Sequence, residues 1–465
     1  MGGLAAHAFP PSTTATALAT TGAAVNCSNA APPTVGQTII CSSTGQLEWQ
    51  TPTSVSLPAG WVSIDSYGTG LGTTATVAAT DIAFATALAT GANVYVPPGT
   101  LSSPRHYLLS TALSLASGQV IDFQSHAAYI GAAPSFAARI AASPTLIIYY
   151  GTTTKLFNQT ASYSRICNAH VIQHPSYAQT SGGAHFSQGH ATNYVYQPEI
   201  ENCISEDAYD AYYLSGLCSH SKISHSEGYT ATRAGFHVDL RVPYGDLNWT
   251  DVQYGGQYTS GSDIGLYVRG IDTSRINGLS IKGCATPIHY AADNDIISKL
   301  IITGIDVEDS IGSGNVVKIG DGTNWVSDCS FTAIEMAAYA NANRPLTIYL
   351  GTKCRRNLID GAILRHYRYK DAGTNNKITN ATINFDNNGG AYATGSAFEL
   401  AATSVGGKIV NCEGFEYATG ITVTAGATRP NISLNDMTGC TTAFTLDATA
   451  KASGRGVGNQ GLADW

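Results

Sequence analysis

The chain has 465 residues, of which 12% are charged and 49 are glycine, and its formal net charge is −8. A low charge content with many turn-forming residues is typical of β-rich proteins. It argues against a helical bundle, which would carry more Glu, Lys and Leu. The net negative charge and the lack of a basic stripe argue against nucleic acid as a partner.

The ten cysteines are scattered, and none forms a C-x-x-C pair. The spacing gives no support to a zinc site, so we expect no metal and no other cofactor. Buried free thiols are the simpler interpretation, and they fit folding in a reducing cytoplasm. We also expect neither a signal peptide nor membrane insertion. The first ten residues lack a basic region, and no stretch approaches the roughly 18 apolar residues of a membrane span.

The N-terminal third contains one predicted helix. Residues 1–60 are rich in Thr, Ala and Pro without a period, which predicts an extended segment. Residues 80–91 have apolar residues at helical spacing, with Thr80 or Asp81 as the N-cap and Gly91 as the stop. The stretch VYVPPGT (94–100) then predicts a short strand that two prolines end.

From about residue 166 onward, a short phrase recurs: an apolar anchor, a bend residue two positions later, and further apolar residues. The anchors are Ile166, Val195, Ile223, Leu247, Ile276, Ile302, Val326, Leu358, Ile378, Ile409 and Ile432. Their mean spacing of about 27 residues predicts a solenoid, in which each repeat buries its apolar face against its neighbours.

Two features make each repeat look like one turn of a β-helix. The bend position is often Asn, Asp or Gly, which tolerate a left-handed backbone. Between the anchors lies a second phrase, a small residue followed by apolar-x-apolar, as in GFHV (235–238) and GLYV (265–268). This alternation is typical of a half-buried strand. Each repeat then holds about three short strands, and stacking the repeats in parallel gives an all-β solenoid.

Residues 61–100, WVSIDSYGTGLGTTATVAATDIAFATALATGANVYVPPGT, resemble the beginning of phage tailspikes and depolymerases of the pectate-lyase-like family. In that family a V-x-D-F/Y-G stretch leads to a short helix and then to V-Y-V-P-P-G-T-Y. Here Leu101 replaces the final Tyr. Residues 33–52, PTVGQTIICSSTGQLEWQTP, look like a short module of phage tail proteins.

The resemblance implies a right-handed parallel β-helix of about eleven or more rungs with a short N-terminal helix cap. It also implies a homotrimer on the phage tail, assembled in the bacterial cytoplasm and attached through its N-terminus, whose partner is a bacterial surface polysaccharide. On this basis we divide the chain into an attachment or linker segment (1–60), a segment with the capping helix and the VPPGT strand (61–112), the β-helix body (113–450) and a C-terminal tail (451–465).

Counted from the anchors, the fourth position points outward and places Glu199, Glu227 and Asp251 on three consecutive rungs. Equivalent residues on neighbouring rungs lie about 4.8 Å apart. Close carboxyl groups raise one another's pKa, and a protonated acid beside an ionised one suits glycoside hydrolysis. We therefore predict Glu227 as the general acid and Asp251 or Glu199 as the nucleophile or base. The alternative is a solvated acidic face.

A second ladder lies on the apolar-x-apolar strands. GFHVDLR directs His237, Asp239 and Arg241 outward, and GLYVRG directs Tyr267 and Arg269 outward one rung later. We expect His237 to face Tyr267, Asp239 to face Arg269, and His289 to follow on the next rung. A cation beside a His or Tyr base suits a lyase acting on uronic acids, or simply substrate binding. The alternative is a structural ion pair with stacked rings.

The third candidate is a loop predicted over ENCISEDAYDAYYL (201–214), where Glu206, Asp210 and Tyr213 would contact substrate. Tyrosine beside carboxylate suits a sugar groove, and the alternative is an exposed turn. All three candidates favour a polysaccharide depolymerase that acts by hydrolysis. A lyase using His237, Tyr267 and Arg269 and a non-catalytic receptor-binding fibre remain as alternatives.

Overall fold

The computed structural model describes residues 57–124, 135–241, 245–256, 263–311, 315–338, 346–385 and 393–460, with four short strands before residue 51. The chain forms two units, Met1–Ala59 and Gly60–Trp465. In the first unit β1 (Leu18–Thr20) pairs antiparallel with β2 (Ala23–Val25), and β3 (Thr38–Cys41) with β4 (Leu47–Gln50). Most of the predicted 1–60 segment lies outside the described residues.

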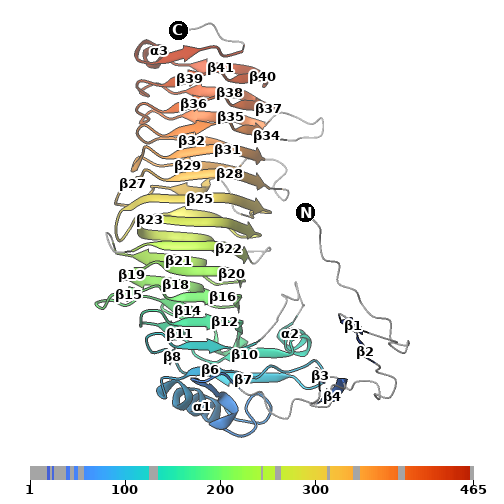
Figure 1. Cartoon of the computed structure of the whole chain (residues 1–465). Coiled ribbons are helices and arrows are strands. Elements are labelled where there is room, and N and C mark those ends of the chain that lie inside the picture. Colours follow the sequence, from blue (N-terminus) through green and yellow to red (C-terminus); the bar gives the residue numbers. More distant parts are fainter. Residues whose placement is uncertain are drawn as a thin grey trace. The chain divides into compact units, whose positions relative to one another are not determined.

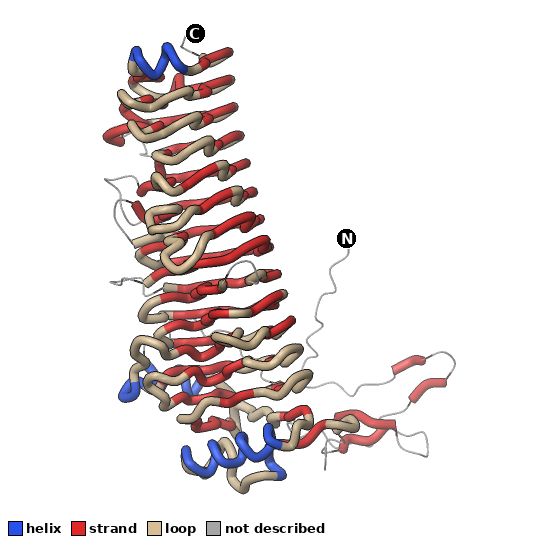
Figure 2. The backbone as a smooth tube through the Cα atoms, turned by 90° about the vertical axis from the view of Figure 1, so that its left-hand side faces the viewer, coloured by secondary structure: helices blue, strands red, loops and turns tan. Residues whose placement is uncertain are grey.

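The second unit is a right-handed parallel β-helix, as predicted. Its strands lie over one another rung after rung (Figures 1 and 2), and 36 of them form one hydrogen-bonded network. Within that network we distinguish two sheets. Sheet 1 contains the strands on both sides of the predicted left-handed bend, and sheet 2 contains the strand that follows them in each rung. The parallel strand pairing begins at Trp61 and continues to Val457. It therefore extends beyond the predicted body (113–450) into parts of the predicted segments 61–112 and 451–465.

Sheet 1 carries two sets of strands. Those before the bend, several of which run through it, are β5 (Trp61–Ser63), β6 (Asn93–Tyr95), β9 (Val120–Asp122), β12 (Arg165–Cys167), β16 (Glu199–Glu201), β20 (Ser221–Tyr229), β22 (Leu247–Gly255), β23 (Ile264–Lys282), β25 (Ile297–Glu308), β27 (Val326–Ser327), β28 (Ser330–Ala337), β30 (Cys354–Arg355), β31 (Leu358–Arg365), β33 (Lys377–Thr379), β36 (Lys408–Val410), β39 (Asn431–Ser433) and β42 (Arg455–Val457). Separate strands after the bend are β7 (Arg105–Leu109), β10 (Thr145–Tyr149), β13 (His170–Gln173), β17 (Ile204–Glu206), β34 (Thr382–Asn384), β37 (Glu413–Phe415) and β40 (Asp436–Gly439).

Sheet 2 takes the first part of β23 together with twelve further strands. These are β8 (Leu113–Ser114), β11 (Lys155–Gln159), β14 (Ala184–Gln188), β18 (Asp210–Gly216), β21 (Ala234–Leu240), β24 (Thr286–Tyr290), β26 (Asn315–Ile319), β29 (Leu346–Leu350), β32 (Tyr367–Asp371), β35 (Ala393–Leu400), β38 (Tyr417–Val423) and β41 (Thr442–Leu446). A small parallel pair, β15 (Val195–Tyr196) with β19 (Cys218–Ser219), lies outside both sheets.

The described helices are short. They are the 3₁₀ turns η1 (Ile64–Ser66) and η2 (Pro175–Tyr177), and the helices α1 (Val77–Ala89), α2 (Phe136–Ala142) and α3 (Ala448–Ser453). The α1 helix lies beside the first rungs at the N-terminal end of the stack (Figure 1). Among the described residues, no helix is long and apolar enough to cross a membrane.

The predicted N-cap of α1 is wrong. Thr76, not Thr80 or Asp81, is the N-cap, and its hydroxyl accepts from Ala79 N at 3.3 Å. The helix therefore starts one turn earlier than the apolar spacing indicated. Asp81 is buried, and its carboxylate accepts hydrogen bonds from the backbone and hydroxyl of Ser110 on the neighbouring segment. Gly91, with φ of +72°, follows the helix end as expected.

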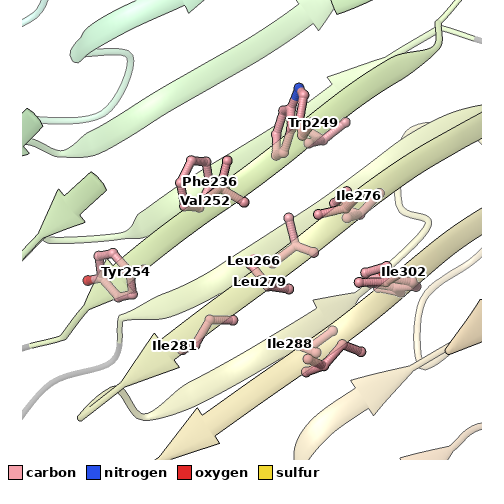
Figure 3. Close-up of a cluster of buried hydrophobic side chains, with 14 of the residues drawn as sticks. Phe236, Trp249, Val252, Tyr254, Leu266, Ile276, Leu279, Ile281, Ile288 and Ile302 are labelled. Atoms are coloured by element: carbon pink, nitrogen blue, oxygen red, sulfur yellow. The ribbon is translucent and has the colours of Figure 1, made fainter. Parts of the chain in front are cut away.

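One inward column of sheet 1 sets the register of the stack. Its members pair in sequence and are buried: Ile166, Ile200, Ile223, Trp249, Ile276, Ile302, Phe331, Ile359, Ile378, Ile409 and Ile432. Trp249, Ile276 and Ile302 lie on successive strands (Figure 3). Seven of the eleven predicted anchors belong to this column, and Val195, Leu247, Val326 and Leu358 are wrong.

The four errors have local causes. Leu247 lies two residues before Trp249 on the same strand and is also buried, so alternation alone does not choose between them. Leu358 directly precedes the true anchor Ile359. Val195 belongs to the β15–β19 pair, and Val326 pairs with Ile297 instead of Ile302.

The bend two positions after the anchor has a left-handed backbone, as predicted. The φ angle is 58° at Asn168, 78° at Gly278 and 53° at Asn411. Asn and Gly adopt this conformation at little cost, and Asn side chains also join rungs, since Asn411 Nδ2 donates to Asn380 Oδ1 at 2.7 Å. The bend reverses which residues face inward, so the third and fifth positions after the anchor are buried.

The eight described cysteines from Cys167 to Cys440 are free thiols, and seven of them are buried. Burial raises the pKa of Cys167, Cys329 and Cys412 to about 12. A thiol with so high a pKa stays protonated and behaves as a small apolar residue. Cys27 and Cys41 lie in parts of the chain whose side chains the structure does not describe.

We expect Ile276→Ala to lower the free energy of unfolding by about 2–5 kcal/mol. Ile276 is buried between Trp249 and Ile302, so truncation leaves a cavity in the column. The matched control is Ile363→Ala, which removes the same atoms from a side chain that is 49% exposed and should cost less than about 1 kcal/mol. Denaturant titration measures both, and equal losses would contradict the register.

A second prediction concerns His185, which is fully buried on β14. Its Nε2–H donates to Gln173 Oε1 (3.1 Å) and its Nδ1 accepts from Ser205 Oγ (2.9 Å). Burial lowers the pKa of His185 from 6.5 to about 3. Between these values the unfolded chain binds a proton that the native state does not, so stability falls as the pH falls.

His185→Gln removes this contribution. From pH 6.5 to about pH 4.5, we expect the free energy of unfolding of the original protein to fall by roughly 2–3 kcal/mol more than that of the variant. Denaturant titrations across that pH range give both slopes. Other titrating groups contribute equally to the two proteins, so parallel slopes would show that His185 is not the cause.

Candidate active site

The predicted acid column does not form, because two of its three anchors are wrong. Glu199 directly precedes the true anchor Ile200, and its carboxylate lies 3.7 Å from Arg165 Nε. Glu227 pairs with Gln253 and accepts a hydrogen bond from the Tyr229 hydroxyl. Glu199 and Glu227 therefore lie in different columns of sheet 1.

The third member of that set, Asp251, occupies the bend column. Its φ angle is 50°, and its Oδ2 lies 3.4 Å from His225 Nε2. Asp251 aligns with the bend glycine Gly278 of the next rung and not with Glu199 or Glu227. The prediction that the three acids stack on consecutive rungs is wrong, and their geometry does not support a shared catalytic role.

The residues predicted as a loop, 201–214, are mostly strand. Glu206 ends β17 and is buried, accepting from Arg139 Nη1 at 2.7 Å and lying 2.6 Å from His170 Nε2. Burial raises the pKa of Glu206, but the hydrogen bonds and charges of His170 and Arg139 outweigh it, so the pKa is lowered. Because Arg139 also binds Asp207, this group attaches α2 to the stack, and within it the Glu206 carboxylate is buried.

The second predicted ladder forms on the outer face of sheet 2. Tyr213, His237, Tyr267 and His289 pair in sequence on four successive rungs. The ring centroids of His237 and Tyr267 lie 4.9 Å apart and those of Tyr267 and His289 lie 5.2 Å apart, both stacked. We call these four residues the aromatic ladder. Tyr213, Tyr267 and His289 are half-buried, whereas His237 between two of them is buried.

The imidazole of His237 is almost completely enclosed. It lies between Tyr213 and Tyr267, and Arg233 Nη2 donates to its Nδ1 at 2.6 Å. Burial lowers the pKa of His237, although Asp210 opposes this. The ring is then neutral, and its Nδ1 lies within hydrogen-bond distance of both Arg233 Nη2 and, at 3.2 Å, Asp210 Oδ2. Among the described residues, its Nε2 has no hydrogen-bond partner.

Asp210 anchors this arrangement from the preceding rung. Its carboxylate is buried and accepts from Arg233 Nε at 2.8 Å, and Arg233 in turn lies over the rings of Tyr209 and Tyr213. Lys155 Nζ lies 4.5 Å from the centre of the Tyr213 ring, and burial lowers the pKa of that lysine. Asp210 therefore positions the ladder and does not itself face solvent.

A pocket of 490 Å³ opens beside the C-terminal ends of β18 and β21. Its lining includes Tyr213, Ser215, Asp239, Arg241, Asn294 and Asp295. These residues come from the rungs of β18, β21 and β24, so the pocket runs along the stack. Two carboxylates, an arginine, an amide and a tyrosine at one opening provide the hydrogen-bond donors and acceptors that sugar hydroxyls require.

Asp239 is held in place within this pocket. Asn294 Nδ2 donates to its Oδ1 at 2.6 Å, and Arg269 Nη1 donates to its Oδ2 at 3.4 Å. The predicted Asp239–Arg269 contact is therefore present. Asp295 comes from the turn after β24, where its Oδ1 also accepts from Ile296 N at 2.8 Å.

The turn 291–295, AADND, was not predicted as part of the site, yet it supplies Asp293, Asn294 and Asp295. Tyr267 donates its hydroxyl to Asp293 Oδ2 at 3.2 Å, and the other two residues line the pocket. The sequence signal that could have indicated this turn is a cluster of two acids and an amide shortly after His289, which was predicted to point outward. Within the described part of the chain, no group of three or more His, Cys, Asp or Glu side chains is arranged to hold a metal.

No protein-family model and no curated protein matches the chain. Among solved structures, tailspike protein 3 of bacteriophage CBA120 is similar, with 13% identity, a TM-score of 0.50, and coverage of 87% of this chain and 62% of that chain. The Dettilon tailspike protein is similar with 14% identity and a TM-score of 0.48, and the match covers 85% of this chain and 70% of that chain. The A-module of mannuronan C-5 epimerase AlgE6 from Azotobacter vinelandii is similar with 12% identity and a TM-score of 0.48, over 85% of this chain and 98% of that chain.

The chain thus corresponds to about three fifths of the length of the CBA120 tailspike. At identities this low, the likeness concerns the fold alone. The chain shares the parallel β-helix fold with tailspike protein 3 of bacteriophage CBA120.

Proposed function

We propose that this protein binds a polysaccharide along the outer face of sheet 2 and hydrolyses it in the pocket at Asp239. The observation that carries the proposal is that Asp239 and Asp295, two rungs apart, line one open pocket beside Tyr213. Two rungs correspond to about 9–10 Å of backbone spacing. That spacing is near the range of about 6.5–9.5 Å between carboxyl groups in inverting glycosidases, which leaves room for a water molecule.

The surroundings of the two acids suggest their roles. Asp239 receives donors from Asn294 and Arg269, an environment that suits a carboxylate acting only as an acceptor. We assign Asp239 as the base that activates water and Asp295 as the acid that protonates the leaving oxygen. Tyr213 and Arg241 border the same pocket and are assigned to substrate binding.

The biological setting that we propose is a phage tailspike acting on a bacterial capsule, exopolysaccharide or lipopolysaccharide. Residues 61–100 resemble the beginning of such proteins, and the fold is that of the CBA120 tailspike. In this setting the chain assembles as a homotrimer and attaches to the tail through its N-terminal unit. Separation by size with light scattering, together with electron microscopy of the virion, tests assembly and location.

We expect Asp239→Asn and Asp295→Asn each to lower kcat by about 10²–10⁴-fold with little change in KM. The matched control is Glu227→Gln, an outward acid of sheet 1 that we expect to retain activity within about twofold. The measurement is the release of reducing ends and of fragments of defined mass from a panel of bacterial surface polysaccharides. Wild-type rates in Asp239→Asn would exclude Asp239 as a catalytic residue.

Elimination is the second candidate, and the neutral, enclosed His237 favours it. His237 lies against Tyr267, and Arg269 lies beside them, where it would have to exchange its ion pair with Asp239 or Asp293 for one with a uronate carboxylate. Elimination leaves an unsaturated sugar that absorbs ultraviolet light, whereas hydrolysis leaves only new reducing ends.

The conservative variant Tyr267→Phe distinguishes these two reactions, because it keeps the stacked ring and removes only the hydroxyl. For hydrolysis at Asp239, we expect cleavage within about threefold of the original rate and no ultraviolet-absorbing product. A loss of about 10²-fold or more, together with an absorbing product from the unmodified enzyme, would overturn hydrolysis in favour of elimination.

A further inference from the structure

An exposed tryptophan lies one rung beyond the pocket. Trp325 is 37% exposed and ends the segment that follows β26. Its carbonyl accepts from Ile297 N at 3.0 Å, and Asn324 N donates to Ala292 O at 3.1 Å. The segment therefore lies directly over the turn that supplies Asn294 and Asp295 to the pocket.

Two cationic side chains lie against this indole. Lys353 Nζ is 5.2 Å and Arg355 Cζ is 5.1 Å from the ring centre. Both come from the next rung, where Lys353 O accepts from Val326 N and Cys354 pairs with Val326. At these distances the quadrupole of the indole ring holds both cations in place.

Neither cation forms an ion pair with another described residue. The side chains of Lys353 and Arg355 have no ion pair or hydrogen bond there, and Arg355 Nε is buried without a partner. The neighbouring acid Asp328 is engaged by Arg356, whose Nε and Nη2 each lie 2.7 Å from one of its oxygens. Hydrogen bonds from Arg356 lower the pKa of Asp328 and the charge of Arg355 also lowers it, but Arg356 holds that carboxylate, so neither Lys353 nor Arg355 has an ion pair in the described residues.

We propose that Trp325, Lys353 and Arg355 form a second saccharide subsite, which binds a sugar carrying a carboxylate. An ammonium and a guanidinium bind a carboxylate through charge-assisted hydrogen bonds, and the exposed part of the indole provides apolar contact for a pyranose. This inference rests on the proposed function and specifies its substrate as an acidic polysaccharide, which extends along the stack from the pocket toward Trp325.

The net charge of −8 makes this local arrangement necessary. A chain with excess negative charge repels a polyanion, so an acidic polymer needs fixed cations along its path. Arg241 lines the pocket and Arg269 borders Asp239, and Lys353 and Arg355 together continue the positive charge two rungs beyond Asp295.

The test is the double variant Lys353→Gln/Arg355→Gln, studied by electrophoresis of the native full chain through gels that contain polygalacturonate, alginate, hyaluronate or dextran. At about 0.15 M salt, where long-range attraction is screened, we expect at least one acidic polymer to retard the original protein. Its Kd should rise about tenfold in the double variant, and binding to dextran should not change. Trp325→Ala should weaken the same acidic polymer by about fivefold.

The matched control is Lys408→Gln/Arg455→Gln, which removes the same charge from two exposed residues of one column of sheet 1. We expect its affinity to stay within twofold of that of the original protein. An equal loss in the control, unchanged binding in the Lys353/Arg355 variant, or failure of all three acidic polymers to bind would each overturn the subsite.

Because the readout is binding, it is independent of the catalytic assignment. An Asp239→Asn protein that binds an acidic polymer but does not cleave it supports both the subsite and the hydrolytic pocket. Cleavage at the original rate by Asp239→Asn would refute the pocket assignment and leave the subsite result standing. Thermal unfolding of each variant checks that it is folded.

Discussion

The structure depends on the stacking of inward apolar columns in exact register. No single rung buries its own apolar face, so Ile223 needs Trp249 above it just as Trp249 needs Ile276. Sheet 2 repeats this with an aromatic column, in which Phe186, Tyr212 and Phe236 stack at centroid distances of 5.1 Å and 4.9 Å. Each buried side chain contributes about 1.5–3 kcal/mol, and a shift of one residue would turn the column toward solvent.

Once the interior fixes the register, the outer face becomes a set of fixed ladders about 4.8 Å apart. Tyr213, His237 and Tyr267 are separated by more than 20 residues in sequence yet contact one another, because Tyr212, Phe236 and Leu266 beside them are buried in register. The site thus acquires its rigidity from the core. The turns add the residues that strands cannot supply, including Asn294, Asp295 and Trp325.

The sequence predicted the ladder of sheet 2 and failed for the acids of sheet 1, because the anchors from which Glu199 and Asp251 were counted are wrong. In GFHV and GLYV a small residue precedes the apolar pair, so only one register fits, and the contacts of His237 with Tyr267 and Asp239 with Arg269 were predicted. In LNWTDV both Leu247 and Trp249 face inward, so the alternation has two solutions two residues apart. Counting from Leu247 instead of Trp249 assigned Asp251 to the predicted catalytic column, whereas it lies at the bend.

By itself, the sequence determined that this is an all-β solenoid, where its left-handed bends occur and that most of its described thiols are buried, because these properties follow from local alternation and from the conformational range of Asn and Gly. Only the tertiary structure decided which acids meet. Asp239 and Asp295 share a pocket, and Lys353 and Arg355 flank Trp325, through turn lengths and rung register that no local pattern encodes. Turn residues carry no periodicity, so their neighbours become defined only when the rungs on either side are in place.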